Sequence, residues 1–188
     1  MGTIDPNPAT RTYPSQYVSS WTMKGGTPVT IRPIRAEDEP LLVKFHETLS
    51  DRTVYLRYFT SLSLSRRTAH ERLARICVGD YEHEMVLVAE YTDPQTSELH
   101  ILGVGRLNKL TPDKEAEVAI LISDQYQHRG LGTELLRRLI HIARDQKVCS
   151  LVAEMLPDNL AIQTIFKRFG FRLRSMGDPT SVHGVLEL

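Results

Sequence analysis

Apolar residues recur along the chain at two spacings, and these spacings separate predicted strands from predicted helices. Short runs rich in β-branched residues, or runs that alternate apolar with polar positions, are typical of strands. A helix instead repeats its apolar positions every three or four residues. The predicted strands cover residues 28–34, 85–91, 100–110, 118–122, 150–155, 171–175 and 182–188.

Helical spacing follows the first strand and returns in the second half of the chain. Residues 36–40 are acidic and end in a proline, which suits a helix start because the free N–H groups there favour negative charge. The sequence predicts one helix directly after them and a second, short helix over 50–59. Two later helices are predicted over 134–146 and 157–169.

A further helix is predicted over residues 65–78, and its two faces differ in character. Ala69, Leu73 and Ile76 form an apolar stripe. The other face is basic, and we expect it to be solvated, as charged helix faces usually are. This basic face consists of Arg66, Arg67, Arg72 and Arg75.

Residues 1–26 are rich in proline and glycine and show little apolar periodicity. Such a composition is typical of a linker or a terminal arm. The sequence therefore predicts a linker or N-terminal arm over 1–26 and one domain over 27–188. Tyr13, Tyr17 and Trp21 could pin the arm to the domain.

The composition is that of an ordinary globular domain, and it narrows the range of partners. The chain has 188 residues, enough for one domain with a real core. Lys+Arg 23 equals Asp+Glu 23, so the net charge gives no sign of a nucleic-acid partner. No apolar run in the sequence is long enough for a membrane span or a signal peptide. We expect a cytoplasmic protein without a metal, with Cys77 and Cys149 as buried free thiols.

The most informative stretch follows the predicted strand at 118–122. Gln127, Gly130 and Gly132 form the pattern Q-x-x-G-x-G directly before a predicted helix. The first N–H groups of a helix have no intrahelical partner and bind anions, and glycines let an anion approach the backbone closely. The pattern matches neither the dinucleotide motif G-x-G-x-x-G nor the P-loop. By itself it fits equally well a turn that begins a helix.

A second signature makes the pattern more specific. Asn159 follows the strand at 150–155, and Gly170-Phe171 follows the next helix. Together, in this order, the two segments resemble the acetyl-CoA-binding motifs of the GNAT superfamily of N-acetyltransferases, and the resemblance covers the chain from about Val29 to its end. It implies an α/β (α+β) protein with the GNAT fold. That fold has a central mixed twisted sheet of about seven strands, splayed at the fourth and fifth, with helices on both faces.

The resemblance implies acetyl-CoA as co-substrate, together with a set of residues that bind it. The pyrophosphate would lie on the N–H groups of the loop, and the pantetheine amides would pair with residues 120–122 as an added strand does. Asn159 would hydrogen-bond the pantetheine or its carbonyl, and it could also be a helix N-cap. Arg129 is the nearest cation for a phosphate. The implied residues are Ile120, Leu121, Ile122, Gln127, His128, Arg129, Gly130, Leu131, Gly132, Thr133 and Asn159.

Acetyl transfer to an amine also needs a base, because an amine attacks a thioester only when neutral and free lysine has a pKa of about 10.4. Glu117 stands beside a wholly apolar strand and matches the position of the catalytic glutamate in the protein acetyltransferases of this superfamily. Two alternatives are open: Glu117 is only the polar end of the strand, or Glu115, which shares its face, is the base. Phe166 stands where many members carry a tyrosine acid, so we assign no general acid.

The front of the domain narrows the resemblance further. Residues 31–35 and 55–59 are similar to the GNAT domain of bacterial protein lysine acetyltransferases, which act on acyl-CoA synthetases. In many of those proteins the domain is fused behind an ADP-forming acyl-CoA-synthetase-like region, and residues 13–15 resemble its end. The resemblance thus implies acetylation of a protein lysine, with an acyl-CoA synthetase as partner. A GNAT enzyme for a small amine and a non-catalytic acyl-CoA-sensing module are the alternatives.

Overall fold

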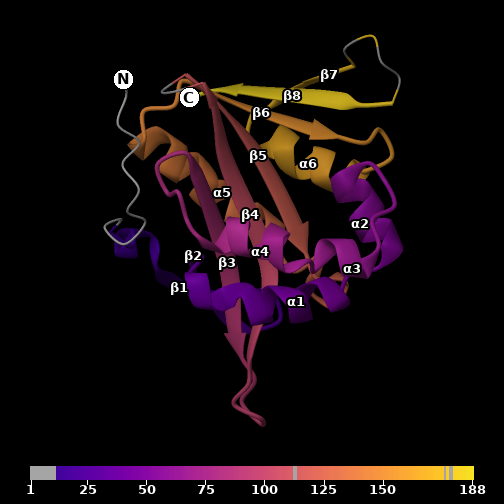
Figure 1. The fold of residues 1–188 in the computed structure, drawn as a ribbon. Helices are drawn as coiled ribbons and strands as arrows, with labels where there is room; N and C mark the ends of the chain where they lie inside the picture. Colours follow the sequence, from indigo (N-terminus) through magenta and orange to yellow (C-terminus); the bar gives the residue numbers. More distant parts are fainter. Residues whose placement is uncertain (1–11, 112–113, 176, 178–179) are drawn as a thin grey trace, which may run out of the picture.

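A mixed sheet forms the centre of the protein, which we describe from a computed structural model covering residues 12–111, 114–175, 177 and 180–188. Within these residues the sheet has eight strands in the order β1-β2-β3-β4-β5-β6-β8-β7 (Figure 1). Neighbouring strands are antiparallel, except that β5 and β6 run parallel. The strands are β1 (Ser19–Thr22), β2 (Pro28–Pro33), β3 (Glu84–Thr92), β4 (Leu99–Thr111), β5 (Glu115–Ile122), β6 (Ser150–Met155), β7 (Arg172–Arg174) and β8 (Val182–Glu187).

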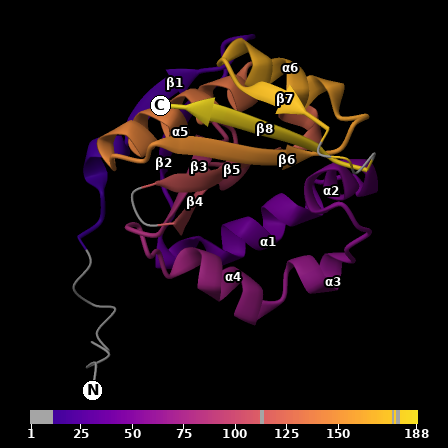
Figure 2. The same cartoon turned by 90° about the horizontal axis from the view of Figure 1, so that it is seen from above.

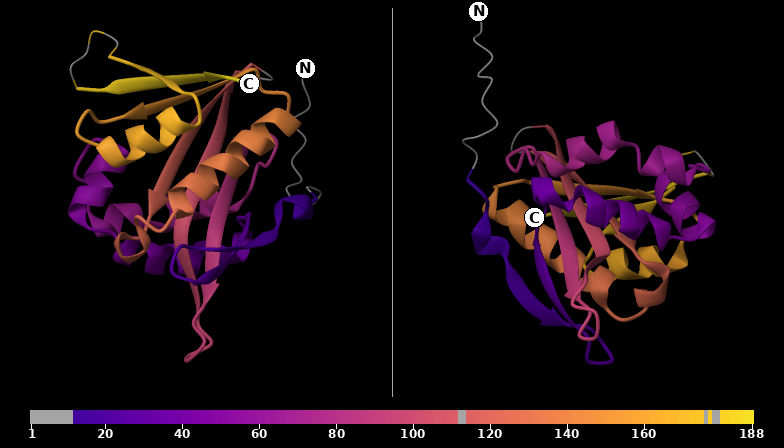
Figure 3. Two further views of the ribbon diagram at one scale, coloured as in Figure 1. Left: turned by 180° about the vertical axis from the view of Figure 1, so that it is seen from behind. Right: turned by 60° about the horizontal axis from the view of Figure 1, so that its bottom comes forward.

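Helices cover both faces of the sheet (Figure 2). On one face, α5 packs against β4 and β5, and α6 lies beside it (Figure 3, left, where this face is in front). On the other face, α1, α2 and α4 bury apolar side chains against the sheet. The α-helices are α1 (Glu39–Glu47), α2 (Asp51–Tyr58), α3 (Leu64–Arg67), α4 (His70–Cys77), α5 (Leu131–Asp145) and α6 (Leu160–Arg168), with short 3₁₀ turns at Ser15–Tyr17, Ala36–Asp38 and Asp124–Tyr126.

Two apolar clusters, one on each face, hold these layers together. Leu135, Leu136 and Leu139 of α5 are fully buried and belong to the larger cluster. Phe45 and Leu73 belong to the cluster under α1 and α4. Burying a side chain of this kind contributes roughly 1.5–3 kcal/mol. The predicted mixed sheet with helices on both faces is confirmed.

The eighth strand, β1, lies in the stretch that the sequence predicted to be a linker or arm. It pairs with β2 from Ser19↔Ile31 to Thr22↔Pro28, through a hairpin whose two glycines have positive φ. The sequence missed it because its residues S-S-W-T are mostly polar and its stability comes from pairing with β2. The aromatic pins are confirmed: Tyr13 Oη donates to the Pro33 carbonyl (2.8 Å), Tyr17 Oη to Asp145, and Trp21 packs on the core. The part of the predicted arm over 1–11 lies outside the described residues, as do positions 178–179 between the predicted strands 171–175 and 182–188.

The single helix predicted over 65–78 is wrong, because the structure has two helices there, α3 and α4. The chain is extended at Ala69, and Arg67 turns inward and donates from Nη1 to the His46 carbonyl (3.1 Å). Arg72 is also half-buried and donates to Tyr58 Oη (3.0 Å). The prediction of a solvated basic face therefore fails for Arg67 and Arg72. Both residues contact polar groups on neighbouring helices, and the sequence of residues 65–78 alone does not reveal these contacts.

The cysteine prediction holds for one residue of the pair. Cys77 is buried under α1, and this burial raises the pKa of its thiol to about 12. Cys149 is exposed, which corrects the prediction that both thiols are buried. It stands just before β6 begins at Ser150, at the end of the sheet rather than between its layers.

A buried ion pair links β2 to the turn before α1. Arg32 donates through both terminal nitrogens to Asp38 (2.7 Å each) and also contacts Glu90 on β3. Arg32 stands between Ile31 and Pro33 in the predicted strand 28–34, and its side chain is only 3% exposed. Among the described residues, no helix is both long and apolar enough to cross a membrane.

Candidate active site

A cleft opens where β5 and β6 part. Their parallel pairing runs from Glu115↔Ser150 to Glu117↔Val152, although β5 continues to Ile122 and β6 to Met155. On its other side β5 stays in regular register with β4 as far as Ile122. The cleft has a volume of ≈ 710 Å³ and is walled by β5, the end of β6, α2 and α6. Within the described residues, β5 thus presents an unpaired edge to it between Val118 and Ile122.

The start of helix α5 closes one end of this cleft. Gly130 is its N-cap with φ +85°, a conformation that glycine adopts without strain. Gly132 lines the cleft, and a Cβ added there would meet Ile165 Cδ1 at 3.4 Å, with Ile122 and Ile120 beyond it. The first N–H groups of α5 lack intrahelical partners, and the helix dipole adds positive potential. This end of the cleft is therefore suited to an anion.

Two amide side chains hold the loops on either side of the cleft in place. Gln127 donates from Nε2 to the Ile122 carbonyl (3.2 Å) and to Thr53 Oγ1 of α2 (3.1 Å), which ties the loop to the opposite wall. Asn159 is the N-cap of α6, and its Oδ1 accepts from the Ile162 N–H at 3.3 Å. Both side chains line the cleft. The N-cap role predicted for Asn159 is confirmed.

The structure adds one cation that the sequence did not predict. Lys24, in the hairpin after β1, lines the cleft, and its backbone N–H donates to the Arg129 carbonyl (3.0 Å). Its Cε lies 3.9 Å from the position of a Cβ added to Gly130. Lys24 was missed because residues 1–26 were assigned to an arm. The Lys-Gly-Gly turn after an alternating Trp-Thr-Met segment is the hairpin signal that could have revealed it.

The side chain of Arg129, predicted to be the nearest cation, is not itself part of the cleft wall but adjoins Tyr126, which is. It is exposed, and its guanidinium stacks over the Tyr126 ring, 5.2 Å from the centroid. Leu131 is likewise not part of the cleft wall, because its side chain is 1% exposed in the core. Leu131 can therefore contribute only through its backbone, whereas the guanidinium of Arg129 lies next to a ring of the cleft wall. The other predicted residues line the cleft: Glu117, Ile120, Leu121, Ile122, Gln127, His128, Gly130, Gly132, Thr133 and Asn159.

Glu117 lies on the floor of the cleft, at the point where β5 leaves β6. It is half-buried and faces Arg57 of α2, which lines the same cleft. Burial lowers the pKa of Arg57, and the negative charge of Glu117 is among the influences that oppose this shift. Glu115, two residues earlier on the same face, does not belong to the cleft wall. Glu154 at the end of β6 does, and it is a carboxylate that the sequence did not single out.

Phe166 lines the cleft at the position where a tyrosine could have served as the general acid. It is 2% exposed and packs against Phe171, with ring centroids 4.6 Å apart. A phenyl ring can shape the cleft but cannot protonate a leaving group. No cluster of three or more metal-binding side chains occurs in the described part of the chain.

A comparison with known protein families identifies the family of this chain. A family model described as "Acetyltransferase (GNAT) domain" matches residues 29–172. The chain belongs to the GNAT acetyltransferases. The predicted GNAT fold, splayed at β5 and β6, is thereby confirmed, and the protein is an acyltransferase.

Individual proteins similar to this GNAT chain include acetyltransferase PA5475 of Pseudomonas aeruginosa, 28% identical over 150 residues, which cover 80% of this chain and 78% of that protein. Acetyltransferase Pat of Mycolicibacterium smegmatis is 28% identical over 140 residues, covering 74% of this chain but 40% of that protein. The chain thus spans well under half of this Pat relative.

Solved structures agree with this family. The crystal structure of the GNAT domain of S. lividans PAT has a TM-score of 0.83 and 25% identity, covering 94% of this GNAT chain and 100% of that one. The structure of yncA from Salmonella typhimurium, determined with its cofactor acetyl-CoA, has a TM-score of 0.63 and 19% identity, covering 85% of this chain and 94% of that one. The second likeness shows the fold alone.

Proposed function

We propose that the cleft between β5 and β6 binds acetyl-CoA as a substrate. The pyrophosphate lies at the N-terminus of α5, where free N–H groups and Lys24 supply positive potential. The pantetheine arm lies along the unpaired edge of β5 and takes the place of the strand that β6 no longer supplies. The single observation that carries this proposal is the end of β5–β6 pairing at Glu117 and Val152. The end of this pairing opens a slot that leads from the N-terminus of α5 to the carboxylate of Glu117.

We further propose that Glu117 is the general base. The acceptor arrives as an ammonium ion and loses one proton to the Glu117 carboxylate, which releases it to water. The neutral nitrogen then attacks the thioester carbonyl and loses its second proton to Glu117. The new amide forms as the carbon–sulfur bond breaks, and the thiolate leaves without an acid, since Phe166 has no proton to give. The proton then passes from Glu117 to water, which restores the base. Glu117 is favoured over Glu115 because it belongs to the cleft wall.

The acceptor that we propose is a lysine side chain of a protein, in particular an acyl-CoA synthetase. Support comes from the sequence similarity of residues 31–35 and 55–59 to the lysine acetyltransferases that modify such synthetases. The likeness to the GNAT domain of S. lividans PAT points the same way. On the two helices that wall the cleft, Tyr55 of α2 and Leu160 of α6 are exposed large side chains that a protein surface could cover.

Binding of acetyl-CoA is tested with a graded pair of variants at Gly132. A methyl group in Gly132→Ala reaches Ile165 at an ordinary contact distance and should be tolerated. The additional methyl groups of Gly132→Val would crowd Ile165, Ile122 and Ile120, which all line the cleft, and should abolish binding in calorimetry. If Gly132→Val binds acetyl-CoA as tightly as Gly132→Ala, the substrate does not occupy this slot.

The acceptor is tested with labelled acetyl-CoA and two panels, one of acyl-CoA synthetases and one of polyamines and amino acids. We expect label on a synthetase lysine, located by mass spectrometry and absent with Glu117→Gln. Turnover of a small amine without any acetylated synthetase would establish the small-amine alternative instead.

A further inference from the structure

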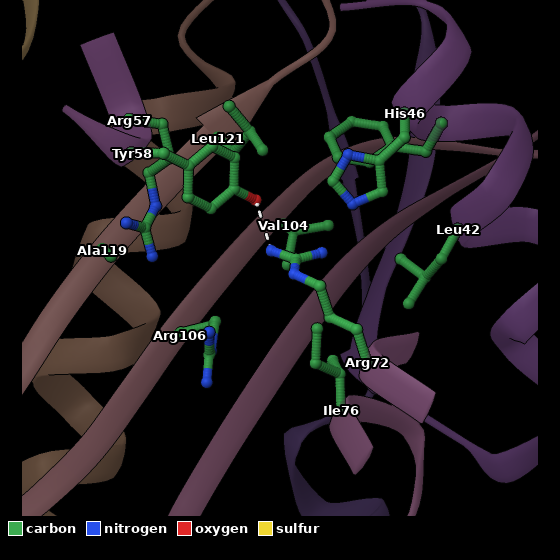
Figure 4. A pocket seen from close by; sticks show the side chains of 11 residues that line it. Leu42, His46, Arg57, Tyr58, Arg72, Ile76, Val104, Arg106, Ala119 and Leu121 are labelled. Carbon is green, nitrogen blue, oxygen red and sulfur yellow. Dashed lines mark hydrogen bonds between the residues drawn. The ribbon is translucent and has the colours of Figure 1, made fainter. Parts of the chain in front are cut away.

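A second, smaller cavity adjoins the acetyl-CoA cleft, between the sheet and helices α1, α2 and α4 (Figure 4). Its volume is ≈ 30 Å³, room for about two water molecules at roughly 10–15 Å³ each. Arg57, Ala119 and Leu121 line both this cavity and the cleft. The proposed acetyl-CoA contacts make no use of it. It therefore needs an explanation of its own.

The polar groups around this cavity are mainly hydrogen-bond donors. Figure 4 shows Arg57, Arg72 and Arg106 converging on it from three different elements, with Tyr58 beside them. A guanidinium donates and never accepts. Arg72 Nη2 donates to Tyr58 Oη at 3.0 Å, which leaves the hydroxyl hydrogen of Tyr58 available for another partner. The remaining wall is largely apolar, so an occupant that accepts hydrogen bonds is favoured.

Positive charge exceeds negative charge around the cavity. Arg106 pairs with Glu84, and Arg57 faces Glu117. Arg72 instead donates to two neutral acceptors, the Tyr58 hydroxyl and the Arg67 carbonyl. The buried Arg67 donates to the His46 carbonyl, and within the described residues its Nε has no partner. Buried cations need compensating charge, and an anion would supply it.

His46 provides an independent sign of a missing partner. Its side chain lines the cavity, it is 4% exposed, and within the described residues its Nδ1 has no hydrogen-bond partner. Burial, together with the charges of Arg72 and Arg67, lowers the pKa of His46 to about 4. The ring is therefore neutral near pH 7 and can donate one N–H without adding charge. Buried nitrogens without partners are rare in native proteins and call for an explanation.

We propose that this cavity binds a carboxylate-sized anion held by Arg72, Tyr58 and His46. The volume admits a carboxylate and is too small for a nucleotide phosphate group with its attachments. One source is an acidic side chain of the acceptor close to its reactive lysine, since the cavity shares a wall with the cleft that contains Glu117. The other source is a free carboxylate from solution. Binding of an acceptor's acidic side chain in this cavity rests on the proposed function, whereas binding of an anion there does not.

The site is tested by titrating the full chain with sodium formate at constant ionic strength and following the His46 ring in two-dimensional imidazole ¹H–¹⁵N spectra. The wild type should show a saturable shift at His46. Arg72→Gln and Tyr58→Phe should each weaken formate binding about tenfold, the effect expected for one strong hydrogen bond to an anion. Arg75→Gln, which removes an exposed arginine from the same helix, should titrate like the wild type.

Tyr58→Phe keeps the aromatic ring and its packing, so the test stands even if Arg72→Gln folds poorly. The proposal is overturned if His46 shows no saturable response, or if Tyr58→Phe binds formate as the wild type does.

The source of the anion is then tested with lysine peptides that carry either Glu or Gln next to the lysine. A preference for the Glu peptide in kcat/KM that disappears in Arg72→Gln and is competed by formate identifies the acceptor as the source. Equal rates with saturable formate binding assign the site to a free anion. Failure to acetylate any peptide would count against the proposed lysine substrate. The anion site would still be decided by the formate titration.

Discussion

Replacing Glu117 by Gln removes the proposed base while keeping the size of the side chain. At a pH of about 7.4, roughly one free lysine in 1,000 is neutral, because its pKa lies about three units higher. Without a base the enzyme must use this neutral fraction, so kcat/KM should fall on the order of 10³-fold, within the usual range for general base catalysis. The neutral fraction rises tenfold per pH unit. The deficit should therefore shrink to about tenfold near pH 9.4.

The structure supplies the controls for this experiment. Glu117 lies on the floor of the cleft, away from the α5 N-terminus, so the affinity for acetyl-CoA in calorimetry should stay near that of the wild type. Glu115 shares the strand face but not the cleft wall, so Glu115→Gln should change the rate less than about threefold. Rates are measured from release of the CoA thiol with a lysine acceptor across this pH range. A deficit that does not change with pH would refute proton removal as the role of Glu117.

Three further predictions follow from the fold and the site. Lys24→Ala should weaken acetyl-CoA binding about three- to tenfold with kcat nearly unchanged, whereas Arg129→Ala should do less because that guanidinium is exposed and already stacks over the Tyr126 ring; calorimetry at two salt concentrations compares them. Asp38→Asn leaves its buried arginine partner undercompensated and should lower the free energy of unfolding by about 3 kcal/mol in urea titrations. An aromatic disulfide reagent should modify Cys149 in the native protein at once and Cys77 only on unfolding, since burial raises the pKa of the Cys77 thiol to about 12; rapid release of two equivalents would contradict this.

The parts of the fold that were predicted correctly depend on residues close together in sequence. The strand at 150–155 matches β6 because four of its six residues are apolar and buried: Leu151, Val152, Ala153 and Met155. The loop containing Gln127 and Gly132 was located because a strand end, a turn and a helix start follow one another without interruption. A local pattern is sufficient when the element is determined by its own residues.

The parts that were missed depend on distant partners. Strand β1 is polar and exists through pairing with β2, and Lys24 reaches the cleft through that hairpin, more than a hundred residues from Gly130 in sequence. The break between α3 and α4 depends on Arg67 reaching the carbonyl of His46 on another helix. Tertiary contacts of this kind override local helical preference, and periodicity alone carries no information about them.

The short β5–β6 pairing also has a mechanical consequence. Among the described residues, the block of β6, β8, β7 and α6 pairs with the rest of the sheet along the short stretch from Glu115↔Ser150 to Glu117↔Val152, which the N–H groups of Cys149 and Ser150 extend by hydrogen bonds to the Lys114 carbonyl. Such a seam allows the block to open as a separate cooperative unit, at a lower free energy than global unfolding. A substrate lying in the slot would bridge both sides like a removable strand. Amide hydrogen exchange in β6 and β8 would then slow when acetyl-CoA binds, while exchange in β2 and β3 would hardly change, so the ligand serves as a clamp between two halves of one sheet.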